Sequence, residues 1–197
     1  MHDHTRDRAL QAGRLLVANP LLPDPNFDRT VVLLLAYDPD GGTAGVVLNR
    51  PGEGPVAVPW PRWEGLAAAP AVLFVGGPVD RTTVICLASP TDVTHLSAGG
   101  VPRPGWVPVS PEIGTIDPTS DDGSANAFRH VRMFAGYAGW AAGQVEHEID
   151  AGAWWVVDAT PEDAFCADPG RLWKRVLRRQ AGSLALVASY PGDPSNN

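Results

Sequence analysis

Residues 136–140 read Gly-Tyr-Ala-Gly-Trp, and residues 143–149 continue as Gly-Gln-Val-Glu-His-Glu-Ile. The first part follows the apolar run Val131–Ala135, which is typical of a strand, and its small residues let another backbone approach closely. Tyr137 and Trp140 bring two large amphipathic rings to the same place. In the helix predicted next, Gln144 and Glu148 lie one turn apart and share a face. The segment therefore predicts a strand that passes to a helix beside two rings, an amide and a carboxylate.

This segment has two interpretations, a packing corner or a recognition site. We place the start of the helix at Ala141 or Ala142. No nucleophile accompanies the carboxylates, which favours the packing corner over a catalytic site. Glu148 lies beside the apolar side of the helix, so we expect it to be structural, with Arg50 as a candidate partner. We expect Gln144 to face a cleft.

Upstream, two apolar runs flank the sequence Asp-Pro-Asp-Gly-Gly at residues 38–42. Residues 30–37 are apolar throughout, as in a strand buried on both faces. Residues 43–49 form the second run, and an Asp-Gly pair between two such runs predicts a β-hairpin. The predicted core consists of residues 31–37, 46–48, 71–75 and 131–135.

The next strand, Ala71–Val75, runs into Gly76-Gly77-Pro78. We predict that it forms a second hairpin with the strand Thr82–Ala88. Gly76 and Gly77 can aim backbone N–H groups at an anion. Pro78 lacks an N–H, and we therefore favour a tight turn.

The remaining elements are predicted from caps and apolar runs. Thr160 before Pro161 is typical of a helix start. A second helix after Asp168-Pro169 carries an apolar stripe. Further predictions are a loop at 52–61, a short helix at 60–69, strands at 113–116 and 154–157, a helix from Ser120 to Arg129, and a last strand at 183–187.

Composition limits the function classes. The chain has 197 residues and a formal net charge of -7, which argues against binding to nucleic acid, because such binding needs a basic surface. Cys86 and Cys166 lie far apart, and the histidines are scattered, so we predict no disulfide, no metal and no cofactor. Because the chain lacks a long apolar run and a signal core, we expect a cytoplasmic protein with no membrane contact.

Several motifs occur in the order found in one bacterial family. They are Ala18-Asn19-Pro20, Phe27, Gly45-Val46-Val47-Leu48-Asn49-Arg50-Pro51, Gly76-Gly77-Pro78-Val79 and the segment 136–149. Over residues 13–177 the chain resembles the YqgE/AlgH family. This family has no established reaction, and its members are labelled as transcriptional regulators. Asn19 stands where the family often has Met.

The resemblance implies an α+β fold, a bent mixed β-sheet folded into a partly closed barrel with flanking helices. We expect one domain at residues 11–190, a flexible arm at 1–10 and a flexible tail at 191–197. The sequence has no helix-turn-helix motif that would support the family's label as a regulator, so we do not infer direct DNA binding. A cationic last helix favours nucleic acid, but we interpret it as a solvated face.

Two functional classes follow from these observations. The first is a binding or regulatory protein with a protein or small-molecule partner. The second is an enzyme that acts on a small polar substrate with Glu146 or Glu148 as acid or base. Arg50 either binds a ligand carboxylate or phosphate or pairs with one of these glutamates. The candidate ligand- or partner-binding residues are Asn49, Arg50, Gly76, Gly77, Tyr137, Trp140, Gln144, Glu146 and Glu148.

Overall fold

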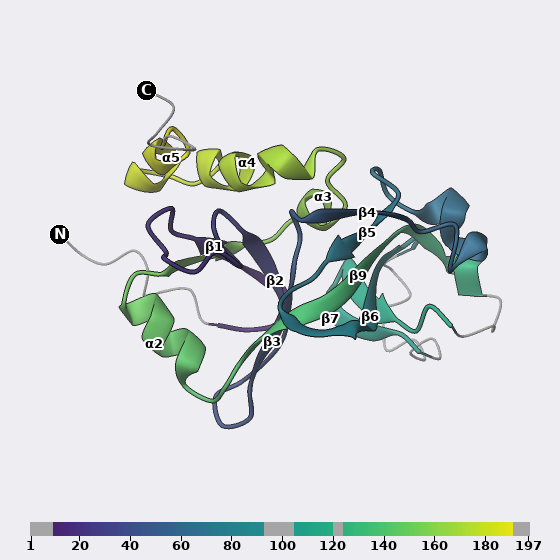
Figure 1. The fold of residues 1–197 in the computed structure, drawn as a ribbon, viewed down its shortest axis with the longest axis horizontal. Coiled ribbons are helices and arrows are strands. Elements are labelled where there is room, and N and C mark those ends of the chain that lie inside the picture. Colours follow the sequence, from purple (N-terminus) through teal and green to yellow (C-terminus); the bar gives the residue numbers. More distant parts are fainter. Residues whose placement is uncertain (1–9, 93–104, 120–123, 191–197) are drawn as a thin grey trace.

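The computed structural model describes residues 10–92, 105–119 and 124–190 (Figure 1). Their strands are β1 (Arg14–Ala18), β2 (Val31–Asp38), β3 (Gly42–Val47), β4 (Pro51–Pro55), β5 (Val72–Val75), β6 (Val79–Pro90), β7 (Val107–Ser110), β8 (Ile113–Ile116), β9 (Phe128–Trp140) and β10 (Trp154–Asp158). The helices are α2 (Gln144–Asp150), α3 (Pro161–Ala164), α4 (Leu172–Arg178) and α5 (Ser183–Val187), with the 3-10 turns η1 (Pro61–Leu66), η2 (Ser124–Ala127) and η3 (Pro169–Arg171).

The strands form one mixed sheet in the order β10-β1-β2-β3-β9-β6-β8-β7. β5 joins it by parallel pairing with β9, and β4 pairs with β5. The sheet bends until β7 approaches the start of β1, where a Cβ added to Gly13 would lie 2.9 Å from the Val109 carbonyl oxygen. Among the described residues, β7 forms no hydrogen-bonded ladder with β1 or β10 at the other end of the sheet. The α+β prediction of a mixed sheet with flanking helices is confirmed, and the barrel is not closed.

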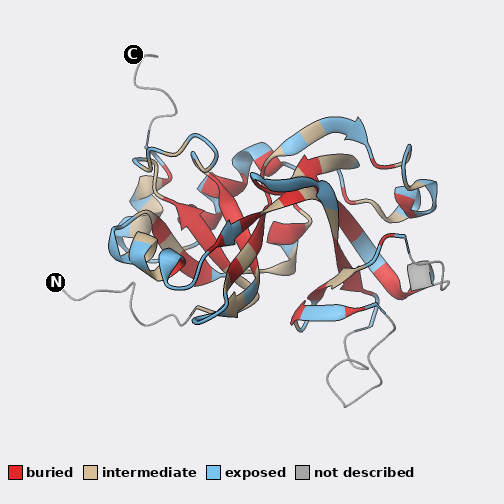
Figure 2. Ribbon diagram, turned by 60° about the horizontal axis from the view of Figure 1, so that its bottom comes forward, coloured by how far each residue is buried: buried red, intermediate tan, exposed pale blue. Residues whose placement is uncertain are grey.

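The apolar strands are buried on both faces because hydrophobic clusters, three among the described residues, lie on both sides of the sheet. On β1, Leu15 and Val17 contribute to one core and Leu16 and Ala18 to the other, as the two-residue period of a strand requires. α4 covers the first core, and the buried Val145 of α2 packs into the second. Figure 2 shows buried strands in the middle of the molecule.

The predicted first hairpin is confirmed. β2 pairs with β3 from Val32–Val47 to Asp38–Gly42, with a bulge between Leu34 and Ala36. The helix start at Thr160 is confirmed as well, since Thr160 and Asp163 form a capping box at α3. The predicted apolar stripe lies on α4, where its residues are buried.

The predicted second hairpin is wrong. β5 does not pair with β6 but with β4 and β9, and β6 pairs with β9 and β8. The connection through Gly76 and Gly77 crosses over β9, because a Cβ on Gly76 would lie 2.2 Å from the Gly136 carbonyl oxygen. The two glycines thus permit a crossing of two backbones, which is neither a tight hairpin turn nor an exposed anion site.

The segment at residues 136–140 is strand, not a corner. β9 continues through Gly136 to Trp140, and α2 begins at Gln144, later than predicted. The pairing of Thr43 with Trp140 through Gly45 with Ala138 keeps the segment extended. Gly136 has a φ of 71°, which lets the strand continue past the crossing at Gly76.

Other local predictions need correction. Residues 183–187 form helix α5 instead of a strand, residues 51–55 form strand β4 instead of a loop, and the helix predicted at 60–69 is the 3-10 turn η1. The prediction that a helix ends at Arg129 is wrong, because strand β9 already starts at Phe128. Its predicted start at Ser120, most of the predicted arm at 1–10 and the tail at 191–197 lie outside the described residues.

Candidate functional site

Glu148 is the centre of a hydrogen-bond network between α2 and the sheet. Its Oε2 accepts the indole N–H groups of Trp140 at 2.9 Å and Trp154 at 2.7 Å. Its Oε1 accepts the side-chain amide of Gln144 at 2.9 Å. Three neutral donors therefore hold the carboxylate, and both of its oxygens are used.

Aromatic rings enclose this network. Trp140 and Trp154 meet edge to face with centroids 5.9 Å apart, and Phe27 lies 5.3 Å from Trp154. Phe27 also stacks on Trp140 at 6.0 Å. Glu148 thus ties the helix to two rings whose N–H groups would otherwise lack an acceptor.

Arg50 does not form the predicted pair with a glutamate, and the binding role predicted for Gln144 stays a prediction. Gln144 is exposed at the start of α2, where its Oε1 accepts the Ala141 N–H at 3.0 Å. Arg50 does not reach Glu146 or Glu148 but donates to the Asp28 carbonyl oxygen. The expected Arg50–Glu148 pair is therefore wrong, because the two indoles satisfy the carboxylate instead.

Glu146 pairs with a tyrosine. The Tyr37 hydroxyl donates to Glu146 Oε1 at 2.8 Å, and this hydrogen bond, with burial, raises the pKa of Tyr37. The other oxygen of Glu146 is buried and has no hydrogen-bond partner among the described residues.

Asn49 lies at the other end of β3 and holds backbone. Its Oδ1 accepts the Val31 N–H at 2.9 Å, and its Nδ2 donates to the Arg29 carbonyl oxygen at 2.9 Å. Arg29 has a φ of 48°, so Asn49 and Arg50 both support a loop that contains an unfavourable backbone conformation.

The sheet surface near the ends of β3 and β9 is hollowed. This β3–β9 hollow has a volume of about 400 Å³. It is lined by Ala36, Gly41, Gly42, Thr43, Ala44, Val79, Tyr137, Gly139 and Trp140. Tyr137 and Trp140 are the two of the nine candidate residues that line it, so the structure does not bring all nine together.

A second hollow of about 470 Å³ lies where the ends of the sheet approach each other. It is lined by residues 11–14, 109–111 and 158–159, and none of the nine candidate residues contributes to it. Arg14 and Asp158 form an ion pair within this lining.

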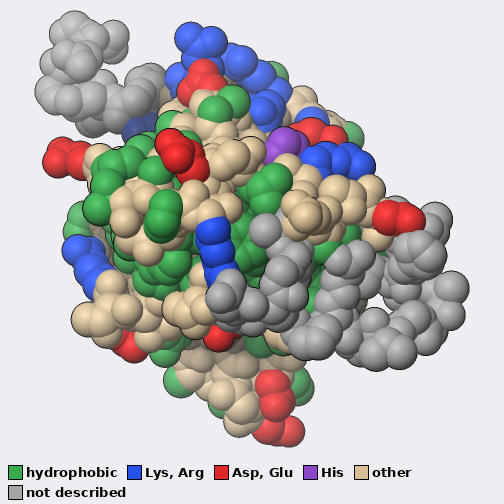
Figure 3. Space-filling view, turned by 90° about the vertical axis from the view of Figure 1, so that its right-hand side faces the viewer, with side chains coloured by type: hydrophobic (Ala, Val, Ile, Leu, Met, Phe, Trp, Pro, Cys, Tyr) green, Lys and Arg blue, Asp and Glu red, His purple; other side chains and the backbone are tan. Residues whose placement is uncertain are grey.

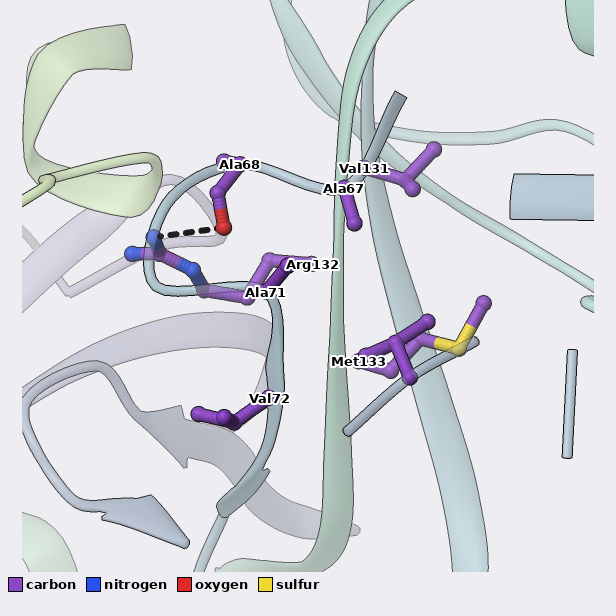
Figure 4. A pocket seen from close by; sticks show the side chains of 8 residues that line it. Ala67, Ala68, Ala71, Val72, Val131, Arg132 and Met133 are labelled. Atoms are coloured by element: carbon purple, nitrogen blue, oxygen red, sulfur yellow. Dashed lines mark hydrogen bonds between the residues drawn. The ribbon is translucent and has the colours of Figure 1, made fainter. Parts of the chain in front are cut away.

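Arg132 is a buried cation that the sequence prediction missed. It is 2% exposed, donates to the carbonyl oxygens of Ala164, Ala69 and Cys166, and its guanidinium lies 4.4 Å from the Phe74 ring centroid. Burial lowers the pKa of Arg132 to about 10. The gap beside it has about 0 Å³ of space for water (Figure 4), so Arg132 joins backbone segments rather than opening a ligand site. The sequence signal that could have revealed it is a charged residue inside the otherwise apolar run 131–135.

The cationic residues in and next to α4 differ in their contacts. All four of Lys174, Arg175, Arg178 and Arg179 are exposed, but Arg175 and Arg179, the latter just after α4, also reach the buried Asp163 at 3.6 and 2.6 Å. Figure 3 shows Lys and Arg side chains gathered at the top of the molecule, the side on which Figure 1 places α4. Of the five cations predicted to form this face, Arg175 and Arg179 pair with Asp163 and Arg171 pairs with Asp168.

The described residues contain no group of three or more His, Cys, Asp or Glu side chains that could hold a metal ion. None of their helices is long and apolar enough to cross a membrane. Cys86 and Cys166 are both buried and free.

Comparisons with known proteins give one consistent result. The AlgH-like family model matches residues 15–185. A UPF0301 protein of Thermobifida fusca is 48% identical over 196 residues, which cover 97% of this chain and 98% of that protein. A UPF0301 protein of Mycobacterium tuberculosis is 41% identical over 198 residues, covering 99% of this chain and 96% of that protein.

Two solved structures share the fold. A crystal structure of a protein from Corynebacterium diphtheriae has a TM-score of 0.84 at 26% identity and covers 93% of this chain and 94% of that one. The solution structure of the AlgH protein from Pseudomonas aeruginosa has a TM-score of 0.64 at 26% identity, covering 92% and 95%. The resemblance found in the sequence motifs is confirmed, and this chain belongs to the AlgH-like family.

Proposed function

We propose that this protein is a cytoplasmic binding protein that regulates a partner, and that its recognition site is the β3–β9 hollow. The observation that carries the proposal is an exposed floor of small residues in the middle of a sheet. Ala36 and Gly139 are exposed there, beside Tyr137 and the 37% exposed Val79. A concave, mostly apolar surface with a few polar groups is the usual form of a binding site.

Gly139 supports this proposal because the fold does not require a glycine there. It has no left-handed φ, and an added Cβ would meet the Tyr137 ring at 3.3 Å, so an alanine needs only a small ring shift. Gly136, by contrast, needs its positive φ and its close approach to the Val79 carbonyl oxygen. The missing side chain at Gly139 keeps the hollow open without serving the backbone.

The geometry supports the enzyme alternative less. Neither Glu146 nor Glu148 lines the hollow, and Glu148 has both oxygens occupied. A regulatory role through a protein or small-molecule partner fits the family's label, and it needs no contact with DNA. The net charge of -7 is consistent with this view.

Saturation-transfer NMR with a library of aromatic and amphipathic fragments tests the proposal. Ala36→Phe places a ring in the hollow, and Val107→Phe is a matched control because Val107 is 60% exposed on β7 and lies outside the hollow. We expect fragments to bind the wild type and Val107→Phe but not Ala36→Phe, with circular dichroism confirming that all three are folded. Full retention of binding by Ala36→Phe would refute the proposed site.

A further inference from the structure

The second hollow lies where the two ends of the sheet approach each other without pairing. One wall is the end of β7 with its turn to β8, and the other consists of the residues that lead into β1 and the end of β10. Gly13 permits the approach, since it has a φ of 83° and an added Cβ would lie 2.9 Å from the Val109 carbonyl oxygen. The volume of the hollow, about 470 Å³, is in the range of small-molecule sites.

The lining of this hollow combines apolar side chains with two charges of opposite sign. Val109 belongs to the first core, and Ala12 and Ala159 pack against that core. Arg14 and Asp158, a cross-strand pair of β1 and β10, are the charged residues in the lining. The lining of the β3–β9 hollow contains no charged residue, so the two hollows suit different ligands.

Arg14 has hydrogen-bond donors that the fold does not use. Its side chain is 19% exposed, and among the described residues its guanidinium donates only to the Asp158 carboxylate. The nitrogens of Arg14 are not among the buried atoms that lack a partner, so the unused donors reach solvent. Because a guanidinium has five N–H donors, the remaining ones can bind a carboxylate in two parallel hydrogen bonds. The side chains of Gln11 and Ser110 add further polar groups to the same lining.

Asp158 supplies the opposite charge on a fixed backbone. Its carbonyl oxygen accepts the Arg179 guanidinium at 2.6 Å, and Arg179 also pairs with the buried Asp163 at 2.6 Å. These contacts hold the end of β10, from which the Asp158 side chain projects. That side chain is 67% exposed, so its carboxylate is accessible to an ammonium group of a ligand.

We infer that the second hollow binds a zwitterionic amino acid with an apolar side chain, at a site separate from the β3–β9 hollow. The ligand carboxylate binds the unused N–H donors of Arg14, and the ligand ammonium group binds Asp158. The ligand side chain packs on Val109 and the two neighbouring alanines. The lining thus offers one partner for each charge of the ligand and an apolar surface for the rest of it.

Amide chemical shifts of the isotope-labelled full chain during titration with three related compounds test the inference. Leucine is the probe, N-acetyl-leucine lacks the ammonium group, and leucinamide lacks the carboxylate. We expect leucine to shift the amides of Gly13, Ser110 and Ala159 and to leave those of Val79 and Gly139 unmoved. Leucine should bind at least about tenfold more tightly than either analogue, because each analogue lacks one charge-assisted hydrogen bond.

A variant of Asp158 tests the assignment of the ammonium group. Asp158→Asn should weaken leucine binding at least about tenfold but should not weaken the binding of N-acetyl-leucine, which has no ammonium group. Glu53→Gln removes the same charge from an exposed position on β4 outside the hollow and should leave the binding of both compounds unchanged. Circular dichroism checks that both variants are folded, which we expect because an exposed ion pair contributes little to stability.

Several results would overturn the inference. They are the absence of leucine binding at any soluble concentration, shifts that avoid the second hollow, and equal weakening of leucine and N-acetyl-leucine by Asp158→Asn. Equal binding of all three compounds would mean that neither charge is recognised. Each of these results leaves the proposed function intact, because that proposal depends on fragments that bind the β3–β9 hollow.

Discussion

At the scale of single residues, the network around Glu148 shows how a polar group can belong to a core. Trp140 and Trp154 each bury an indole whose N–H needs an acceptor, and one carboxylate oxygen serves both. Glu148 is therefore a structural residue by its contacts. Gln144 is exposed and adds one bond to the carboxylate and one to the start of α2.

Glu148→Ala should lower the free energy of unfolding by about 1–3 kcal/mol, because two buried indole donors lose their acceptor. Gln144→Ala should cost less than about 1 kcal/mol, since its side chain is exposed. Glu148→Gln, which keeps one oxygen acceptor, should fall between them. Urea unfolding of the three variants measures the order, and equal losses from Glu148→Ala and Gln144→Ala would refute it.

Cys86 predicts a pH dependence. Burial raises the pKa of its thiol from 9.0 to about 12, so the neutral thiol is favoured in the fold. The stability that the fold gains from burying Cys86 as a neutral thiol is fully present below pH 9. It is lost as the pH rises from 9 toward 12, because the thiol of the unfolded chain ionises first. The difference in unfolding free energy between the wild type and Cys86→Ala should therefore shrink by about 1.4 kcal/mol from pH 7 to pH 10. A difference that stays constant over this range would contradict the prediction.

At the scale of elements, β9 organises the sheet. It pairs with β3, β5 and β6, and the chain crosses it at Gly76 and Gly77 to pass from β5 to β6. The crossing places Val79 beside Tyr137 and so builds one side of the hollow.

Gly76→Ala should destabilise the fold by at least about 2 kcal/mol, because its Cβ would lie 2.2 Å from the Gly136 carbonyl oxygen. Gly54→Ala is the matched control on β4, where an added Cβ meets nothing within 4 Å. Thermal unfolding compares the two variants. Similar melting temperatures would mean that the crossing is not tight.

The sequence predicted elements whose signals are local and missed those decided by distant contacts. The Asp-Gly turn predicted the β2–β3 hairpin, and Thr160 predicted the cap of α3, because neighbouring residues determine both. The apolar runs around Gly76 also fitted a hairpin, and only the crossing over Gly136 decides against it. Residues 183–187 fit a strand or a helix by composition, and here they form α5 beside α4.

Prediction of the candidate site also depended on whether a residue's signal is local in the sequence. Tyr137 and Trp140 are the two predicted residues that line the hollow, because β9 carries both to it. Ala36, Ala44 and Val79 come from other strands and give no signal in the sequence, since small or apolar strand residues are common. The partner of Glu148 was predicted as Arg50, because charge alone suggests a cation and not two indoles.

At the scale of the whole molecule, three hydrophobic clusters share one sheet, and this should give one cooperative unit. Leu34 is fully buried in the second core, so Leu34→Ala should cost about 2–5 kcal/mol. Scanning calorimetry should show a single transition for the wild type and the variant. Two well-separated transitions in the wild type would contradict the single domain.

The fold should depend on neither a metal nor a disulfide. Both cysteines are free, and the core consists of apolar side chains. Prolonged treatment with a chelator or with a reductant should therefore leave the melting temperature unchanged. A fall of several degrees in either treatment would contradict this prediction.

The most direct test of the account is a map of amide chemical shifts on the isotope-labelled full chain during titration with the strongest-binding fragment. The account predicts that the shifted amides cluster at Thr43, Val79 and Gly139, around the β3–β9 hollow. The same titration of Ala36→Phe should leave these amides unmoved. Shifts that cluster instead at residues 11–14 and 109–111, in the second hollow, would contradict the account.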